Sequence, residues 1–288
     1  MSAADLARMV TIAALWGASF MFLRIAAPNL GAILSAEIRL VVAGVILYVY
    51  ARWTREQIGL KQHAWRYFVI GAVGSSVPFA LYGFAAMHLP AGLNAIINAT
   101  SPLYAAIGAA LLFGDRLTAV RIAAIIVGAI GVWVLAGDVV VADSPYALWA
   151  LFAALGAAFC YGFGGIVTKL YGPKVSPIVM AGASQLYSAL LIAPLLPIVE
   201  IPGPITLTAV SAAVALSILA SVFGYVMYFQ LLEKVGPVRT LYVTFLIPVF
   251  GVFWGVVILD EQVTTRALAG GALILVAVWL ETRMNRRA

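Results

Sequence analysis

The chain has 288 residues, of which 64% are apolar and 10% are charged, and several long stretches carry no charged residue. Stretches of this length and apolarity are stable only in hydrocarbon, so the composition excludes a soluble globular protein. The net charge of +6 comes from Lys and Arg residues that lie in short segments between the apolar stretches. They form no basic face, which argues against a nucleic-acid partner.

Ten windows of about 20 apolar residues follow one another along the chain. The first five lie at residues 6–26, 33–50, 67–86, 92–113 and 119–136. The other five lie at residues 146–169, 177–197, 207–232, 238–259 and 265–282. No small-residue cleavage site follows a short apolar core in the first window, so we expect a retained helix there. The sequence predicts an all-α membrane protein with ten transmembrane helices.

The basic residues gather on alternate connections between these windows. With a cytoplasmic N-terminus, the inner segments hold 14 of the 17 Lys and Arg residues. The outer loops hold only Arg266. By the positive-inside rule both termini are then cytoplasmic, and the segment 138–145, with Asp138 and Asp143, is an extracellular linker.

The two halves of the sequence resemble each other. A shift of 146 positions aligns residues 81–134 with residues 227–280 without a gap. Because each half has an odd number of helices, the second copy enters the membrane from the opposite face, as in many secondary transporters. We therefore expect two inverted five-helix repeats, 1–137 and 146–288. The most informative matches pair Tyr82 with Tyr228, Pro102 with Pro248, Asp115 with Glu261, Thr118 with Thr264, and Trp133 with Trp279.

Candidate substrate-binding side chains come from helices that the repeat relates. Asn94, Asn98 and Ser101 recur at helical spacing, which places them on roughly one face of the fourth helix. Such a strip can contact a solute or bond one helix to another, and both alternatives stay open. Aromatic rings suit an aromatic or apolar solute, but also pack against lipid or core. The full candidate set is Trp16, Ser19, Ser75, Phe79, Tyr82, Asn94, Asn98, Ser101, Tyr161, Tyr225, Tyr228, Tyr242 and Thr244.

Pro102 and Pro248 stand near the centres of the fourth and ninth helices. Each removes a backbone donor and opens carbonyls about one turn earlier, which kinks a helix. Their repeat-related positions predict a pair of hinges, although many transmembrane prolines are static.

Arg24, Glu37 and Arg39 are ionisable residues within the first two apolar windows, and a charge inside the membrane is a candidate functional group. Counted from the outer end of the second helix, Glu37 and Arg39 lie roughly 6 to 9 Å deep, within reach of the interface. We therefore expect an outer-gate ion pair. No acidic residue lies at mid-membrane, which favours facilitated or weakly coupled transport over a dedicated proton relay.

Signatures of other functions are missing from the sequence. It contains no HExxH, GxSxG or Walker motif, so we predict no enzymatic activity. Cys160 is the only cysteine, which leaves no disulfide within the chain and no cysteine-built metal site, and we predict no cofactor or metal. A channel is an alternative, but inverted halves with paired prolines fit alternating access better.

Several motifs resemble those of the ten-helix EamA-type exporters of the drug/metabolite transporter superfamily. They are Leu15–Phe20 (LWGASF), Arg39 before small residues, Ser101–Leu103 leading to Phe113–Thr118, and Ile247–Val249 leading to Leu259–Thr264. The resemblance covers nearly the whole chain and implies an exporter of amino acids, metabolites or toxic cations. A narrower similarity is to the YddG-type exporters of aromatic amino acids. Asp115 replaces the family's usual Glu after the fourth helix, and we interpret it as a helix cap.

Together these observations predict an exporter of small metabolites in a bacterial inner membrane. The predicted substrates are amino acids with aromatic or neutral side chains. The alternatives are an exporter of apolar cations or drugs, and a membrane scaffold that binds a ligand without moving it. We expect a central cavity enclosed by helices one to four and six to nine, with the fifth and tenth helices outside it. The partners are a small-molecule substrate and the bilayer, and the oligomeric state stays open.

Overall fold

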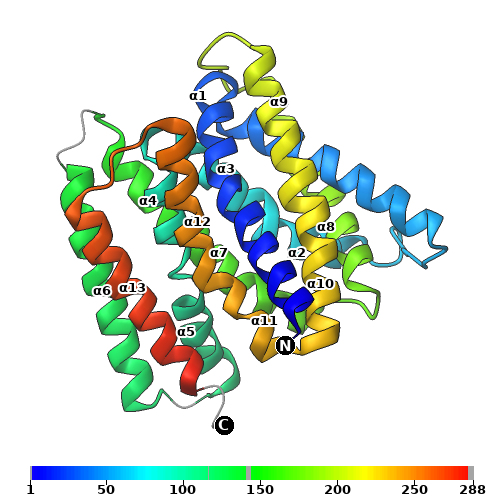
Figure 1. Ribbon diagram of the computed structural model, residues 1–288. Helices are drawn as coiled ribbons and strands as arrows, with labels where there is room; N and C mark the ends of the chain where they lie inside the picture. Colours follow the sequence, from blue (N-terminus) through cyan, green and yellow to red (C-terminus); the bar gives the residue numbers. More distant parts are fainter. Residues whose placement is uncertain (1, 116, 141–143, 285–288) are drawn as a thin grey trace.

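The computed structural model describes residues 2–115, 117–140 and 144–284, and these residues form helices and connecting loops without a strand (Figure 1). Within these ranges, nine helices are long and apolar enough to cross a membrane. The first, α1 (Ala3–Trp53), is two helices in one element, because Gly31 has φ 77° and ψ 169° and breaks the helical path. Only glycine adopts this backbone conformation readily. Pro28, which donates no hydrogen bond, lies three residues earlier.

The remaining helices follow the apolar windows of the sequence. The rest of the first half comprises α2 (Ala64–Gly71), η1 (Ala72–Ser76), α3 (Val77–His88), α4 (Ala91–Asn98), α5 (Ser101–Phe113) and α6 (Ala119–Val140). The second half comprises α7 (Ala147–Tyr171), α8 (Pro177–Ile192), η2 (Ala193–Leu195), α9 (Leu207–Leu216), η3 (Ser217–Phe223), α10 (Gly224–Val235), α11 (Pro237–Thr240), α12 (Tyr242–Leu259) and α13 (Thr265–Met284).

The expected linker 138–145 begins inside a helix. Helix α6 continues without a break to Val140, beyond the expected end at residue 136. Residues 141–143 of the linker lie outside the described residues.

Two π-helical segments interrupt the third and eighth predicted spans. They are η1 (Ala72–Ser76) and η3 (Ser217–Phe223), and the shift of 146 positions carries the first onto the second. A π-helix bonds each N–H to the carbonyl five residues earlier and often marks a functional site. The hydropathy pattern of the sequence did not predict these segments.

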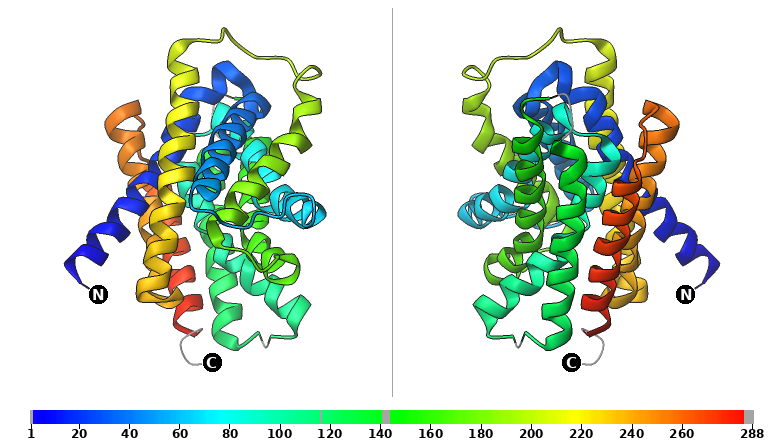
Figure 2. Two further views of the ribbon diagram at one scale, coloured as in Figure 1. Left: turned by 90° about the vertical axis from the view of Figure 1, so that its right-hand side faces the viewer. Right: turned by 90° about the vertical axis from the view of Figure 1, so that its left-hand side faces the viewer.

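Small residues let the helices of the two halves pack closely. A methyl group on Gly17 of α1 would lie 2.6 Å from Cβ of Phe250 and 2.8 Å from the backbone N of Gly251 in α12. Gly251 in turn faces Ala95 of α4. The small-residue pair Gly251 and Gly255 therefore serves packing within the chain. At one edge of the bundle, α6 and α13 lie side by side (Figures 1 and 2).

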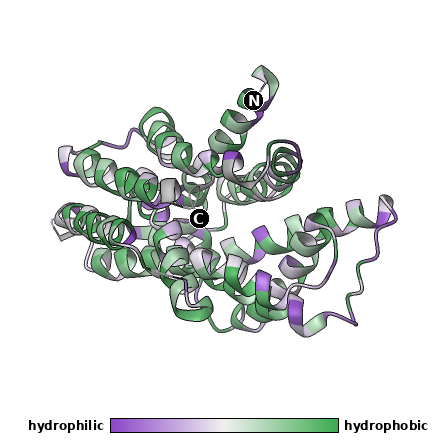
Figure 3. Cartoon of the chain, turned by 90° about the horizontal axis from the view of Figure 1, so that it is seen from below, coloured by the Kyte–Doolittle hydropathy of each residue, from purple (hydrophilic) through white to green (hydrophobic). Residues whose placement is uncertain are grey.

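Large apolar side chains cover much of the outer surface. Trp133 on α6 is 76% exposed, and Ile126 on α6, Leu190 on α8 and Leu268 on α13 are also exposed. Figure 3 shows hydrophobic segments along most of the helices. A surface of this kind is stable in contact with lipid tails. The chain is a multi-pass membrane protein.

Candidate functional site

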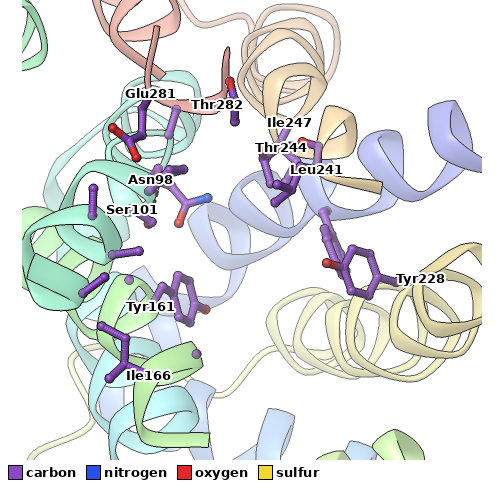
Figure 4. A pocket seen from close by; sticks show the side chains of 18 of the residues that line it. Asn98, Ser101, Tyr161, Ile166, Tyr228, Leu241, Thr244, Ile247, Glu281 and Thr282 are labelled. Atoms are coloured by element: carbon purple, nitrogen blue, oxygen red, sulfur yellow. Dashed lines mark hydrogen bonds between the residues drawn. The ribbon is translucent and has the colours of Figure 1, made fainter. Parts of the chain in front are cut away.

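A cavity of about 720 Å³ lies in the middle of the helix bundle (Figure 4). Tyr161, Asn98 and Ser101 lie on one side of the space, and Tyr228 and Thr244 on the other. Eight of the thirteen candidate substrate residues line the cavity. They are Trp16, Ser19, Asn98, Ser101, Tyr161, Tyr225, Tyr228 and Thr244.

The other five candidates lie outside the cavity wall. Phe79 and Tyr82 pack behind Tyr161, with ring centroids 6.4 and 5.7 Å from it. The hydroxyl of Tyr82 donates a hydrogen bond to Oδ1 of Asn98 at 3.0 Å, which orients that amide at the wall. The remaining three lie elsewhere: Asn94 is buried against the core, Ser75 is buried in η1, and Tyr242 packs against the main core cluster.

An aromatic wall forms where α1 meets α10. The Trp16 ring centroid lies 5.1 Å from that of Tyr228 and 6.2 Å from that of Tyr225. The indole Nε1 of Trp16 donates a hydrogen bond to the carbonyl of Ala220 in η3 at 3.0 Å. A side chain at Gly224 would overlap this indole, since a methyl group there would lie 2.5 Å from Nε1. The ring is thus fixed in place, with faces available for stacking.

The fourth span is broken at the cavity. Helix α4 ends at Asn98 and α5 begins at Ser101, so Pro102 occupies the first turn of a new helix. Two hydroxyls satisfy carbonyls at the break: Thr100 donates to Ile97 O and Ser101 to Asn98 O, both at 2.7 Å.

The repeat-related ninth span differs at its proline. Pro248 lies inside the continuous helix α12, and the interruption falls earlier, at Leu241 between α11 and α12. The two prolines are therefore in different local structures.

The prediction of an ion pair among Arg24, Glu37 and Arg39 is wrong, because no ion pair joins them in the part of the chain that the structure describes. Arg24 donates from Nη1 to the carbonyl of Ala86 at 2.7 Å. The Arg39 guanidinium lies 3.7 Å from the centre of the Phe79 ring, and its Nε donates to Ser221. Residues 37 and 39 are two positions apart on a helix and point to different sides. Arg39 therefore faces the cavity, whereas Glu37 does not line it.

Charged residues line one end of the cavity, at the ends of α5, α7 and α13. They are Asp115, Lys169 and the ion pair between Arg121 Nε and Glu281 Oε1, at 3.2 Å. Arg121 belongs to α6 and Glu281 to α13, the fifth and tenth predicted spans. The expectation that these spans stand outside the cavity is therefore wrong for this end, because α6 and α13 pack together and turn both side chains inward.

Sequence matches place the chain in a known family. A model of the EamA-like transporter family matches residues 6–137 and, separately, residues 148–283. The chain belongs to the EamA-like transporter family. This membership confirms the resemblance to EamA-type exporters that the sequence motifs indicated. A solved crystal structure shares the fold of this EamA-like chain with a TM-score of 0.67, covering 100% of this chain and 99% of that one at 20% identity.

Relatives of this EamA-like transporter are similar along almost its whole length. One is named a probable amino-acid metabolite efflux pump of Escherichia coli, 24% identical, with 97% of this chain and 95% of that protein aligned. Another is named a probable terminal-alkyne amino-acid exporter of Streptantibioticus cattleyicolor, 26% identical, with 94% and 90% aligned. The family is one of transporters, and the names of these relatives agree with it.

Proposed function

We propose that the chain exports small metabolites, specifically amino acids with aromatic or neutral side chains, across a bacterial inner membrane. The observation that carries this proposal is the cavity, in which a wall of Trp16, Tyr225 and Tyr228 faces the polar side chains of Asn98 and Ser101. Solute sites of this kind combine apolar rings with a few polar groups that fix orientation. The names of two relatives, an amino-acid metabolite efflux pump and an amino-acid exporter, support the substrate class.

The transport mechanism in this proposal is alternating access between two inverted repeats, 1–137 and 146–288, with both termini in the cytoplasm. The distribution of basic residues supports this topology. The π-helical segments η1 and η3, which occupy repeat-related positions, support the duplication. In this topology the charged end of the cavity, with Asp115 and Lys169, faces the cytoplasm, which supports an inward-facing conformation.

The break before Pro102 supplies a hinge in this mechanism. Asn98 and Ser101 flank the break and both line the cavity, so a change of angle between α4 and α5 would move solute contacts directly. Pro248 is the second hinge of the proposal, within the apolar packing of α12.

Downhill efflux from loaded liposomes tests the proposed function. Vesicles containing the purified protein are loaded with labelled phenylalanine, threonine or the organic cation 1-methyl-4-phenylpyridinium, and release is compared with that from protein-free vesicles. We expect release of both amino acids above the protein-free rate. Release of the cation alone would instead identify a drug exporter, and binding without any release would identify a scaffold.

A further inference from the structure

Arg39 brings a positive charge into the cavity without an acidic partner. Among the described residues, the ion pairs are Arg121 with Glu281 and Lys234 with Asp5, and neither involves Arg39. An ionised side chain is costly inside the membrane unless it is paired, hydrated or functional. Arg39 is one of the residues that line the central cavity, so we expect a group that enters the cavity to reach its charge.

Neutral groups hold Arg39 in place. Phe79 presents its ring face to the guanidinium at 3.7 Å, and Oγ of Ser221 accepts a hydrogen bond from Nε at 2.9 Å. Ser221 belongs to η3, so the π-helical segment supplies this contact. Tyr161 and Tyr225 lie close enough to interact with the charge of Arg39. These contacts fix the direction of the side chain and leave its charge unneutralised.

Acidic residues elsewhere in the wall do not compensate this charge. Glu281 pairs with Arg121, and Asp115 lies beyond the end of α5, in the charged end of the cavity. Glu37, two positions before Arg39, does not line the cavity, and its Oε2 is buried without a hydrogen-bond partner among the residues that the structure describes. Arg39 thus stands against the Phe79 ring, in a cavity whose wall also includes Trp16 and Tyr161.

We propose that Arg39 binds the carboxylate of the transported solute and thereby selects carboxylate-bearing solutes against organic cations. This inference rests on the proposed export function and names the group that the site recognises. A guanidinium matches a carboxylate in shape and charge and binds it through two hydrogen bonds. The same charge repels a cation, and beside low-dielectric protein the repulsion is stronger than in bulk solvent. The apolar part of the solute then lies against the stacked rings of Trp16 and Tyr228.

Three solutes that share a phenyl ring test this selection on the unaltered protein. Phenylalanine carries a carboxylate and an ammonium, 3-phenylpropanoate carries only the carboxylate, and 2-phenylethylamine carries only the ammonium. Equilibrium binding to the purified protein, followed by its tryptophan fluorescence, should show affinity for the first two solutes and binding at least about ten-fold weaker for the third. Equal or tighter binding of the amine would overturn the proposal.

Variants test whether Arg39 is responsible for this selection. Arg39→Gln should weaken binding of phenylalanine and 3-phenylpropanoate about ten-fold or more, leaving 2-phenylethylamine unchanged or tighter. Arg39→Lys should bind these two carboxylates with affinities between those of Arg39→Gln and the wild type, because an ammonium lacks the guanidinium's paired donors. Arg24→Gln is the matched control, since Arg24 lies on the same element and does not line the cavity. A uniform loss for all three solutes in Arg39→Gln would indicate a structural role and overturn the proposal.

Efflux measurements separate this proposal from the function on which it rests. If the wild-type protein releases no amino acid from liposomes, the export function fails, while the binding series still decides whether Arg39 recognises a carboxylate. If efflux occurs and Arg39→Gln releases phenylalanine at the wild-type rate with wild-type affinity, the export function stands and the role of Arg39 is refuted.

Discussion

Oε1 of Glu261 accepts a hydrogen bond from the backbone N–H of Ala91 at 2.7 Å. The other carboxylate oxygen accepts one from Gly92 at 3.1 Å, so the loop before α13 caps the first turn of α4 in the other half of the chain. A carboxylate at this position satisfies unpaired N–H groups and interacts favourably with the helix dipole. In the proposed topology the contact lies on the outer side, and we expect it to stabilise the inward-facing conformation.

Removing the charge of Glu261 should favour the outward-open conformation. A capping carboxylate contributes about 1 kcal/mol, so Glu261→Gln should raise outward exposure of the cavity by a factor of about five. In a Cys160→Ser background, Ser19→Cys places a thiol in the cavity wall, and its reaction rate with an impermeant maleimide added outside reports this exposure.

Asp260 supplies the control for the Glu261 experiment. It is an exposed carboxylate next to Glu261, at the end of α12, and Asp260→Asn keeps a residue that tolerates the φ of 53° found there. The labelling rate should stay at the wild-type value. An equal increase in both variants, or none in Glu261→Gln, would refute the role of the Glu261 contact.

The aromatic wall should contribute to the affinity for aromatic solutes. Trp16→Ala removes a ring that packs on Tyr228 and Tyr225, and aromatic contacts contribute about 1 kcal/mol beyond burial of area. We expect phenylalanine to bind about five- to ten-fold more weakly, with a smaller loss for threonine. Trp133→Ala, on the exposed face of α6, should leave both affinities unchanged. Equal losses for both solutes in Trp16→Ala would contradict stacking.

The two prolines should differ in their effect on transport. Pro102→Ala permits α4 and α5 to join into one helix across the cavity, whereas Pro248→Ala acts within a helix that is already continuous. We expect Pro102→Ala to slow phenylalanine flux more than Pro248→Ala, and the double variant to be slowest. Protein levels in the membrane serve as the insertion control. Wild-type flux in a normally inserted double variant would exclude hinges at these positions.

The contact of Gly17 with α12 should be sensitive to added volume. Gly17→Ala places a methyl group 2.6 Å from Cβ of Phe250 and should lower the free energy of unfolding by about 1 to 3 kcal/mol, the usual effect of overpacking. Gly165→Ala is the control, because nothing lies within 4 Å of a methyl group there. Thermal unfolding in detergent measures the stability of both variants. An unchanged midpoint for Gly17→Ala would contradict the close packing.

The helices were predictable because hydropathy and proline act locally. A charge-free run of residues 177–197 requires a membrane span wherever it lies, and Pro102 interrupts a helix through its own missing donor. The position of Arg39 was not predictable in the same way. Counting residues from the helix end gave its depth but not the direction of its side chain, which depends on the packing of α1 against α3 and η3.

The cavity residues also differ in how far the sequence predicts their positions. Asn98 and Ser101 lie next to the helix break at Pro102 and line the cavity, which is one of the two alternatives that the sequence left open for them. Asn94 lies one turn earlier on α4 and is buried, because α12 packs against that helix. The pair Arg121 and Glu281 joins helices far apart in the chain, and no local pattern brings these two residues together.

Counterflow of labelled phenylalanine tests the central claim, alternating-access transport, most directly. Liposomes containing the protein are preloaded with a high concentration of unlabelled phenylalanine and diluted into a trace of the labelled amino acid. A carrier that exposes its site alternately exchanges one for the other, so the label should accumulate transiently above its external concentration and then decay. A monotonic approach to equilibrium would indicate a channel, and an uptake equal to that of protein-free liposomes would contradict transport altogether.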